Sequence, residues 1–291
     1  MSGRPDPARV LASLTDSRKY SRVCADALAR IAAQAARSYR TFTEADKAAR
    51  RKLHQALGAF VGEAELDDVE RLLAALPAGA GPEKVADTCR IILGLHASSA
   101  ERLPVMERLY GELARRGKGA TILDLCCGLN PFSLPWMAAL APRGYLGLDL
   151  DTRMSALANG FLARYGPGFG VRAADVLSGA ADVLSGAADV LSRAADVLVG
   201  DAPVCGGAAD LVLLLKSATT LERQEKGSVE RLLGGLKAFL IVVSFPVRSL
   251  GGKEKGMREN YEAEWVPRFE AAGFTVERIP LAEEDFYLIR R

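Results

Sequence analysis

The segment TILDLCCGLNP, residues 121–131, reads as a buried strand that runs into a tight turn, and it decides the fold. Its first six residues open a series of short apolar runs that alternate with helical stretches. Further runs lie at 144–150, 171–177, 209–216, 239–245, 274–279 and 285–291. Strand–helix alternation of this length predicts an α/β fold with a parallel, doubly wound sheet. The last two runs are joined by a short turn, so we expect an antiparallel hairpin at the edge of the sheet.

The part of the chain before this series has no strand-like alternation and is expected to be helical. The expected helices there are 25–39, 44–60, 66–76 and 83–95. Between the strands, helices are expected at 133–140, 153–165, 224–236 and 261–272. We therefore predict a helical domain over 1–108 and an α/β domain over 109–291.

Positive charge is concentrated in the first 60 residues. They hold twelve Lys and Arg residues against five Asp and Glu residues, an excess of seven positive charges. Because the whole chain carries a net charge of only +2, the remainder carries −5. This asymmetry predicts that the first segment meets a polyanion, although a solvated helical surface rich in arginine would have the same composition.

The totals exclude several other classes of protein. The 291-residue chain is 49% hydrophobic and 25% charged, and its longest apolar runs are far shorter than the about 20 residues that span a bilayer. The N-terminus has no apolar core of the signal-peptide kind. Five cysteines show no spacing typical of zinc sites. We expect a cytoplasmic protein with reduced thiols, no membrane association and no metal.

The carboxyl ends of the first two strands carry the candidate cofactor residues, because ligands of such sheets bind there. Asp124 lies in the first strand, and Gly128 follows it where the backbone can approach a ligand. Asp149 ends the second strand and is suited to bind the two hydroxyls of a ribose. The turn lacks GxGxxG, so a nucleoside without a pyrophosphate, such as S-adenosylmethionine (SAM), fits better than a dinucleotide. The alternative is an ordinary Asp-Gly turn beside an unrelated aspartate.

Several motifs carry a family resemblance. They are SRKYSRV (17–23), RRKLHQALGAF (50–60), LHASSAERLP (95–104), ILDLCCGLNPFSLPWM (122–137), LLLKSATTLERQEKG (213–227), VVSFPVRSLGGKEKGMRENY (242–261) and FYLI (286–289). Together and in this order they resemble the aminoglycoside-resistance methyltransferases of 16S ribosomal RNA. More narrowly, they resemble the branch that methylates N7 of guanine 1405 in the decoding site. The resemblance implies a Rossmann-like class I SAM-dependent methyltransferase sheet preceded by an all-helical N-terminal domain.

The resemblance also implies roles for single residues of the cofactor site. SAM would lie over Gly128 with Asp149 on its ribose, and Arg102 would reach the methionine carboxylate. An aspartate after the third strand would face the adenine amino group. Lys216 and Gln224 match positions near the cofactor pocket. By contrast, the lone His96 is expected to be a satisfied core residue.

The same resemblance implies the assembled small (30S) ribosomal subunit as substrate and a monomeric enzyme. The segment after the fifth strand would form a target-recognition loop, with Arg248 and Lys253 on phosphates and Met257 on the displaced base. The candidate docking residues of the basic segment are Lys19, Arg50, Arg51 and Lys52. No catalytic residue is expected, because N7 of guanine has a lone pair and no proton to remove, so transfer needs orientation.

Residues 173–200 repeat one seven-residue unit four times, with aspartates at 175, 182, 189 and 196. Only one copy can end the third strand. The helix–turn–strand passage through VRAAD favours Asp175, whereas counting back from the strand at 209–216 favours Asp196. We expect Asp175 to serve the cofactor and Asp182 and Asp189 to be spacers.

Two further departures from the family pattern keep other functions open. Ser-Ala-Thr at 217–219 replaces a usual apolar pair, and Asp285 stands where an apolar residue is common. One alternative is a SAM-dependent methyltransferase of another rRNA base. The other is a catalytically silent ribosome-binding homologue whose cofactor site is spoiled by the repeat.

Overall fold

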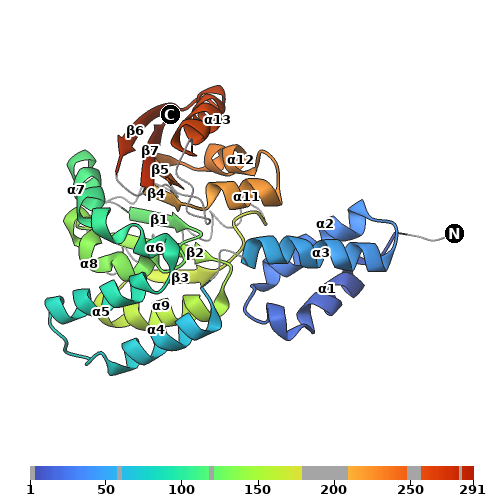
Figure 1. Cartoon of the computed structure of the whole chain (residues 1–291), viewed down its shortest axis with the longest axis horizontal. Helices are drawn as coiled ribbons and strands as arrows, with labels where there is room; N and C mark the ends of the chain where they lie inside the picture. Colours follow the sequence, from blue (N-terminus) through green and yellow to red (C-terminus); the bar gives the residue numbers. More distant parts are fainter. Residues whose placement is uncertain (1–3, 58–60, 118–120, 179–208, 248–256, 282–283) are drawn as a thin grey trace, which may run out of the picture.

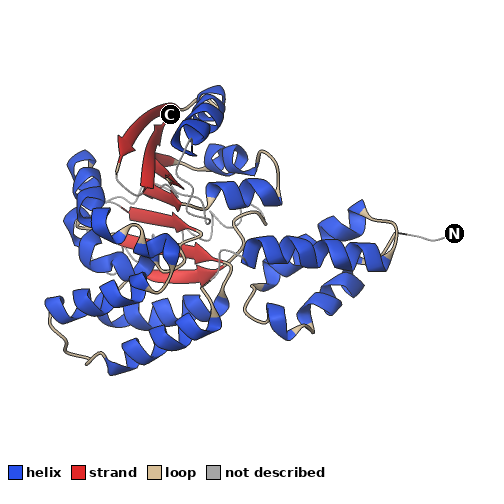
Figure 2. Ribbon diagram, viewed as in Figure 1, coloured by secondary structure: helices blue, strands red, loops and turns tan. Residues whose placement is uncertain are grey.

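The computed structural model describes residues 4–57, 61–117, 121–178, 209–247, 257–281 and 284–291. Figure 1 shows a small helical lobe, formed by the first three helices, that extends from a larger body. The body is a sheet with helices packed around it, as the colours of Figure 2 show.

The N-terminal lobe is a bundle with its own core. It consists of α1 (Pro7–Thr15), η1 (Arg18–Tyr20), α2 (Ala25–Ser38) and α3 (Phe42–Leu57). Asp6 accepts the Ala8 N–H and caps α1, whose first residue is a proline, so the helix start is specified locally. Leu14, Ile31 and Leu53 are buried in the middle of the bundle, one from each helix.

The body contains a seven-stranded sheet with the order β3-β2-β1-β4-β5-β7-β6. The strands are β1 (Thr121–Leu125), β2 (Gly144–Asp149), β3 (Gly170–Ala173), β4 (Ala209–Leu215), β5 (Ala238–Pro246), β6 (Thr275–Pro280) and β7 (Glu284–Arg290). Strands β1 to β5 are parallel, and β7 pairs antiparallel with both β5 and β6. The predicted α/β fold, its seven strands and the edge hairpin are therefore confirmed, although β3 ends four residues earlier than expected.

Two layers of helices bury both faces of the sheet. Alternate residues of a strand point to opposite faces, so Ile122 packs on one side and Leu123 on the other. The first face is covered by α4 (Glu63–Ala75), α5 (Pro82–Gly94), α6 (Ala97–Ala100), η2 (Leu103–Val105), α7 (Met106–Arg116), η3 (Asn130–Ser133), α8 (Leu134–Met137), η4 (Ala138–Leu140) and α9 (Thr152–Tyr165). The second face is covered by α11 (Ala218–Gln224), α12 (Ser228–Gly235) and α13 (Met257–Ala271). Within the described ranges, none of the helices is long and apolar enough to cross a membrane.

The expected domain division at 108/109 does not coincide with the boundary between the hydrophobic cores. Leu53 still belongs to the core of the N-terminal lobe, whereas Val61 and Leu66 belong to the core beneath the sheet. Helices α4 to α7 were assigned by sequence to the helical domain because they have no strands between them. Their apolar faces instead pack against the sheet, so the lobe core extends to Leu57 and the core of the body begins by Val61.

The helix expected at 224–236 is observed over Ser228–Gly235 as α12, and Gln224 belongs to a separate helix, α11. Gly227 has a φ of +68°, a left-handed conformation that separates α11 from α12 and that favours glycine. As a consequence Gln224 is the last residue of α11 and is not at a helix start.

Asp285 is accommodated at its normally apolar position by two arginines. The carboxylate is buried, and Arg278 Nη2 lies 3.1 Å from its Oδ2 while Arg258 Nη1 lies 3.7 Å from its Oδ1. Buried carboxylates need such pairing, and here one arginine comes from β6 of the hairpin and the other from α13.

Two phenylalanines of β5 provide a matched test of how tightly the sheet packs against α13. Phe245 is 1% exposed and its ring centroid lies 4.8 Å from that of Tyr261, whereas Phe239 is 66% exposed. We expect Phe245→Ala to lower the free energy of unfolding by about 3–5 kcal/mol through lost burial and a cavity. Phe239→Ala should change it by no more than about 0.5 kcal/mol. Urea denaturation measures both, and equal effects would contradict the described burial.

Candidate functional site

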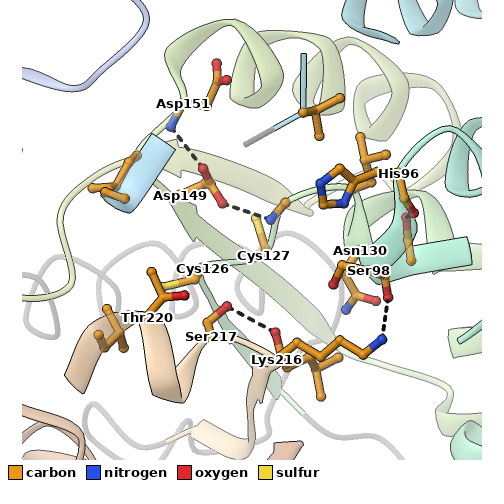
Figure 3. A pocket seen from close by; sticks show the side chains of 18 of the residues that line it. His96, Ser98, Cys126, Cys127, Asn130, Asp149, Asp151, Lys216, Ser217 and Thr220 are labelled. Atoms are coloured by element: carbon orange, nitrogen blue, oxygen red, sulfur yellow. Dashed lines mark hydrogen bonds between the residues drawn. The ribbon is translucent and has the colours of Figure 1, made fainter. Parts of the chain in front are cut away.

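A cavity of about 560 Å³ opens at the carboxyl ends of the parallel strands. Its walls come from the turns after β1, β2, β3 and β4, and from α6 and α11. Figure 3 shows labelled side chains from the turns after β1, β2 and β4, and from the segments of α6 and α11, around one space. The strands β1 and β4 are neighbours in the sheet. The chain after β1 turns toward one face of the sheet, and the chain after β4 turns toward the other. The cavity therefore lies between the two connections, where they separate.

The turn after β1 is fixed by left-handed backbone and by one hydrogen bond. Cys126 and Gly128 have φ values of +55° and +47°. The Gly128 N–H donates to Asp149 Oδ2 at 2.9 Å, which joins the turn to the end of β2. A Cβ at Gly128 would meet nothing within 4 Å, so the backbone angle, and not crowding, favours glycine here.

Asp149 and Asp151 have different structural roles although they are two residues apart. Asp149 lines the cavity, and its Oδ1 accepts the Asp151 N–H at 2.9 Å. Asp151 caps α9 by accepting the N–H groups of Arg153 and Met154, and its carboxylate pairs with Arg22 of the lobe at 2.7 Å. Burial raises the pKa of Asp149, while the two backbone donors oppose that rise.

Asp175, the favoured aspartate of the repeat, lies at the cavity wall beyond β3. Its Oδ1 accepts the Leu177 N–H at 2.9 Å, and its Oδ2 accepts Ser178 Oγ at 2.9 Å and Arg30 Nε at 2.6 Å. Gln224 also lines the cavity, and its Oε1 accepts Arg30 Nη2 at 3.1 Å. The other repeat aspartates, at 182, 189 and 196, lie outside the described residues.

The opposite end of the cavity holds a buried cluster of charged side chains. Arg102 is held by a carboxylate that sequence reasoning missed: its Nη2 lies 3.0 Å from Glu284 Oε1 and its Nε lies 3.1 Å from Oε2. Lys216 Nζ lies 2.5 Å from Glu101 Oε2 and 3.6 Å from Glu284 Oε2, and donates to the Ser98 carbonyl at 3.3 Å. The available signal for Glu284 was a carboxylate two residues before the apolar run FYLI (286–289), where burial requires a cation.

Asp124 does not line the cavity. It lies behind the wall, where its Oδ2 accepts Asn130 Nδ2 at 2.6 Å and the Tyr145 hydroxyl at 2.7 Å. Asn130 itself lines the cavity, and Arg102 Nη1 lies 3.5 Å from its Oδ1. Asp124 thus orients a wall residue, and its predicted contact with the cofactor stays a prediction. Burial raises the pKa of Asp124 to about 6 in spite of these two hydrogen bonds.

His96 and the two cysteines after β1 also line the cavity. His96 was expected to be a core residue, but it is half-buried at the cavity wall, where burial lowers the pKa of its ring. Burial raises the pKa of the Cys126 and Cys127 thiols well above their usual value, and neighbouring Asp149 adds to the rise. Both thiols therefore stay protonated near neutral pH. In the part of the chain that the structure describes, no group of three His, Cys, Asp or Glu side chains is placed to hold a metal ion.

The four predicted docking residues of the lobe differ in whether their charged head groups are free to contact RNA. Lys19 and Arg51 are exposed. Arg50 binds Asp46 and Ser13 of its own lobe, and Lys52 Nζ donates to the Gln224 carbonyl at 3.0 Å. Both head groups are thus already engaged within the protein. Of the predicted loop residues, Arg248 and Lys253 lie outside the described residues, and of Met257 only its backbone position at the start of α13 is described.

Comparisons with known proteins find relatives that match nearly the whole chain, the lobe as well as the body. The sequence model of the family described as ribosomal RNA methyltransferase (FmrO) matches residues 16–194 and 183–289. The 16S rRNA (guanine(1405)-N(7))-methyltransferase of Serratia marcescens is 32% identical over 285 residues, which cover 97% of either chain. The enzyme of the same name from Frankia casuarinae is 30% identical over 287 residues, covering 97% of this chain and 93% of the relative. The crystal structure of 16S rRNA methyltransferase RmtF in complex with S-adenosyl-L-homocysteine superposes with a TM-score of 0.74 at 31% identity, covering 100% of this chain and 99% of that one.

Protonation of Asp124 should make the stability of the folded protein depend on pH. Its pKa is about 6 in the folded protein and 3.8 in the absence of such burial, so between these pH values the folded state holds a proton that the unfolded chain loses. The stabilisation from this proton is complete below about pH 4 and is lost as the pH rises through 6. We expect the stability of the wild type relative to Asp124→Asn to fall by about 2–3 kcal/mol between pH 4 and pH 7. Urea denaturation at a series of pH values measures it, and a constant difference would show that Asp124 is not protonated by burial.

Proposed function

The chain belongs to the FmrO family of ribosomal RNA methyltransferases, and we propose that it transfers a methyl group from SAM to N7 of guanine 1405 in 16S rRNA. The observation that carries the proposal is the extent of the similarity. Relatives with this activity in their names match nearly the whole chain, so the similarity covers the basic lobe as well as the cavity. A shared cofactor fold alone would match the body and leave the lobe unmatched.

The residues of the cavity fit SAM in the order expected from the sequence. Asp149 is held by two backbone donors beside Gly128, and a carboxylate fixed in this way can accept both hydroxyls of a ribose. Asp175 and Gln224 offer oxygen atoms to the adenine amino group. At the other end, Arg102 Nη1 is the arm of the guanidinium least engaged within the protein, because its Asn130 contact is 3.5 Å long. It can bind the methionine carboxylate without breaking the pair with Glu284.

When bound, SAM supplies an electrophilic methyl group on a sulfonium. The protein's contribution is to hold the guanine with its N7 lone pair in line with that group and to exclude water. No side chain needs to remove a proton from N7. Cys126 and Cys127 stand beside the site as protonated thiols, so they do not compete with the base as nucleophiles.

The assembled small (30S) subunit is the substrate, and the enzyme acts on it as a monomer. The exposed Lys19 and Arg51 place positive charge on the N-terminal lobe, which suits recognition of phosphates and RNA shape rather than of base sequence. A stacked guanine must be turned out of its helix to enter the cavity. Methylation at N7 leaves a positive charge and removes a hydrogen-bond acceptor, so a polycationic aminoglycoside binds the decoding site less well.

The direct test is methyl transfer from labelled SAM to purified 30S subunits, followed by mapping of the modified nucleotide. We expect the label at N7 of guanine 1405, and no label when that base has already been methylated. Label at another nucleotide would favour the neighbouring-base alternative. Tight subunit binding without any transfer would identify a silent homologue.

The two candidate aspartates of the repeat can be separated in the same assay. We expect Asp175→Ala to lower kcat/KM for SAM by about 10- to 100-fold, the loss expected for a charge-assisted hydrogen bond. Asp196→Ala, the matched control in an equivalent sequence unit, should leave it within about twofold of the wild type. If Asp196→Ala instead lowers kcat/KM and Asp175→Ala does not, the proposed activity stands and Asp196 is the residue that contacts the adenine.

A further inference from the structure

The N-terminal lobe contacts the body through the same segments that line the cofactor cavity. The Cys24 N–H donates to the Leu150 carbonyl at 2.9 Å, and the Thr152 N–H donates to the Arg22 carbonyl at 2.8 Å. These contacts lie immediately beside Asp149. On the other side, Gln34 Nε2 donates to Glu225 Oε2 at 3.1 Å, next to Gln224. The lobe is therefore docked on the turns after β2 and β3 and on the end of α11.

Arg30 is the residue of the lobe that reaches two cavity-lining side chains at once. It lies in the middle of α2, its side chain is 9% exposed, and its Nε and Nη2 hold Asp175 and Gln224. Among the described residues, its buried Nη1 has no hydrogen-bond partner. A guanidinium presents several donors in one rigid plane, so it fixes the relative orientation of two acceptors more firmly than the rotating ammonium of a lysine does.

Asp175 depends on this contact for its charge balance. Its side chain is 2% exposed, and in the described part of the chain Arg30 is the cation paired with it. A buried carboxylate without a counter-charge is strongly disfavoured, and it relaxes by protonation or by turning toward water. Either change would remove the fixed acceptor that the adenine amino group needs.

We propose that Arg30 is a positioning residue that sets Asp175 and Gln224 for the cofactor, so that docking of the N-terminal lobe and cofactor binding favour each other. The proposal deepens the proposed function and rests on it for the identity of the cofactor. Binding free energies are reciprocal, so a lobe held in place by Arg30 raises cofactor affinity, and bound cofactor holds the lobe. Because Lys19 and Arg51 lie on the same lobe, cofactor binding should also present a fixed RNA-facing surface.

The test is titration of the full-length protein with S-adenosylhomocysteine (SAH), without ribosomes, by calorimetry. We expect Arg30→Met to weaken SAH binding by about 10- to 30-fold and Arg30→Lys by about 3- to 10-fold, because lysine restores the charge but not the two-armed geometry. The control is Arg37→Met on the same helix, since Arg37 is exposed, and it should bind SAH within about twofold of the wild type. Wild-type SAH affinity in an Arg30→Met protein with an intact thermal transition would overturn the proposal. If Arg30→Met does not fold, the Arg30→Lys protein is used instead, and wild-type SAH affinity in that variant would overturn the proposal.

A second readout separates positioning from a merely structural role. SAH should tighten the binding of wild-type protein to 30S subunits by about 3- to 10-fold, and this ratio should fall to about one in Arg30→Met. At saturating SAM and subunits, kcat of Arg30→Met should stay within about threefold of the wild type while KM for SAM rises. A loss confined to kcat would overturn the positioning role. Because SAH titration needs no methyl transfer, it tests Arg30 even if the protein modifies another base or none.

Discussion

Burial of β1 on both faces of the sheet is the constraint on which the rest of the structure depends. All five of its residues are buried, and β2 and β4 flank it on either side. The chain turns sharply where β1 ends, at Cys126 and Gly128. The left-handed residues after β1 and at Lys216 after β4 make these turns toward opposite faces of the sheet. The cavity is the space left where the two connections diverge, and its position follows from the sheet rather than from the residues that line it.

Two buried charged side chains of the cavity wall each pair with an opposite charge from a distant part of the chain. Glu284 of β7 pairs with Arg102, and Arg30 of the lobe pairs with Asp175. Buried ion pairs of this kind contribute little net stability, because desolvation offsets the attraction, but loss of one partner is costly. Their effect is to fix side chains that face the cavity. They also join the helices before the sheet, the C-terminal hairpin and the lobe to one site.

Sequence patterns predicted the individual strands well, but they predicted less well which helices pack together in one domain. The strands followed from short apolar runs, since both faces of the sheet are covered and the central strands β1, β2, β4 and β5 are largely apolar. The domain division at 108/109 stays a prediction, but it does not coincide with the boundary between the hydrophobic cores, because periodicity does not show against which surface the apolar faces of α4 to α7 pack. The helix expected at 224–236 begins later, at Ser228, because Gly227 adopts a left-handed conformation that the pattern did not reveal.

The sequence by itself determined the α/β fold, the strand ends that carry Gly128 and Asp149, and the family, because these depend on contiguous residues. Only the tertiary structure decided which charges meet. Arg30 and Asp175 are 145 residues apart in the chain, and Arg102 and Glu284 are 182 apart. It also placed His96 at the cavity wall and showed that Lys52 is engaged with Gln224 rather than free for RNA. The physical reason is that a charge in a sequence has no fixed partner, whereas burial in the fold forces each charge to find one.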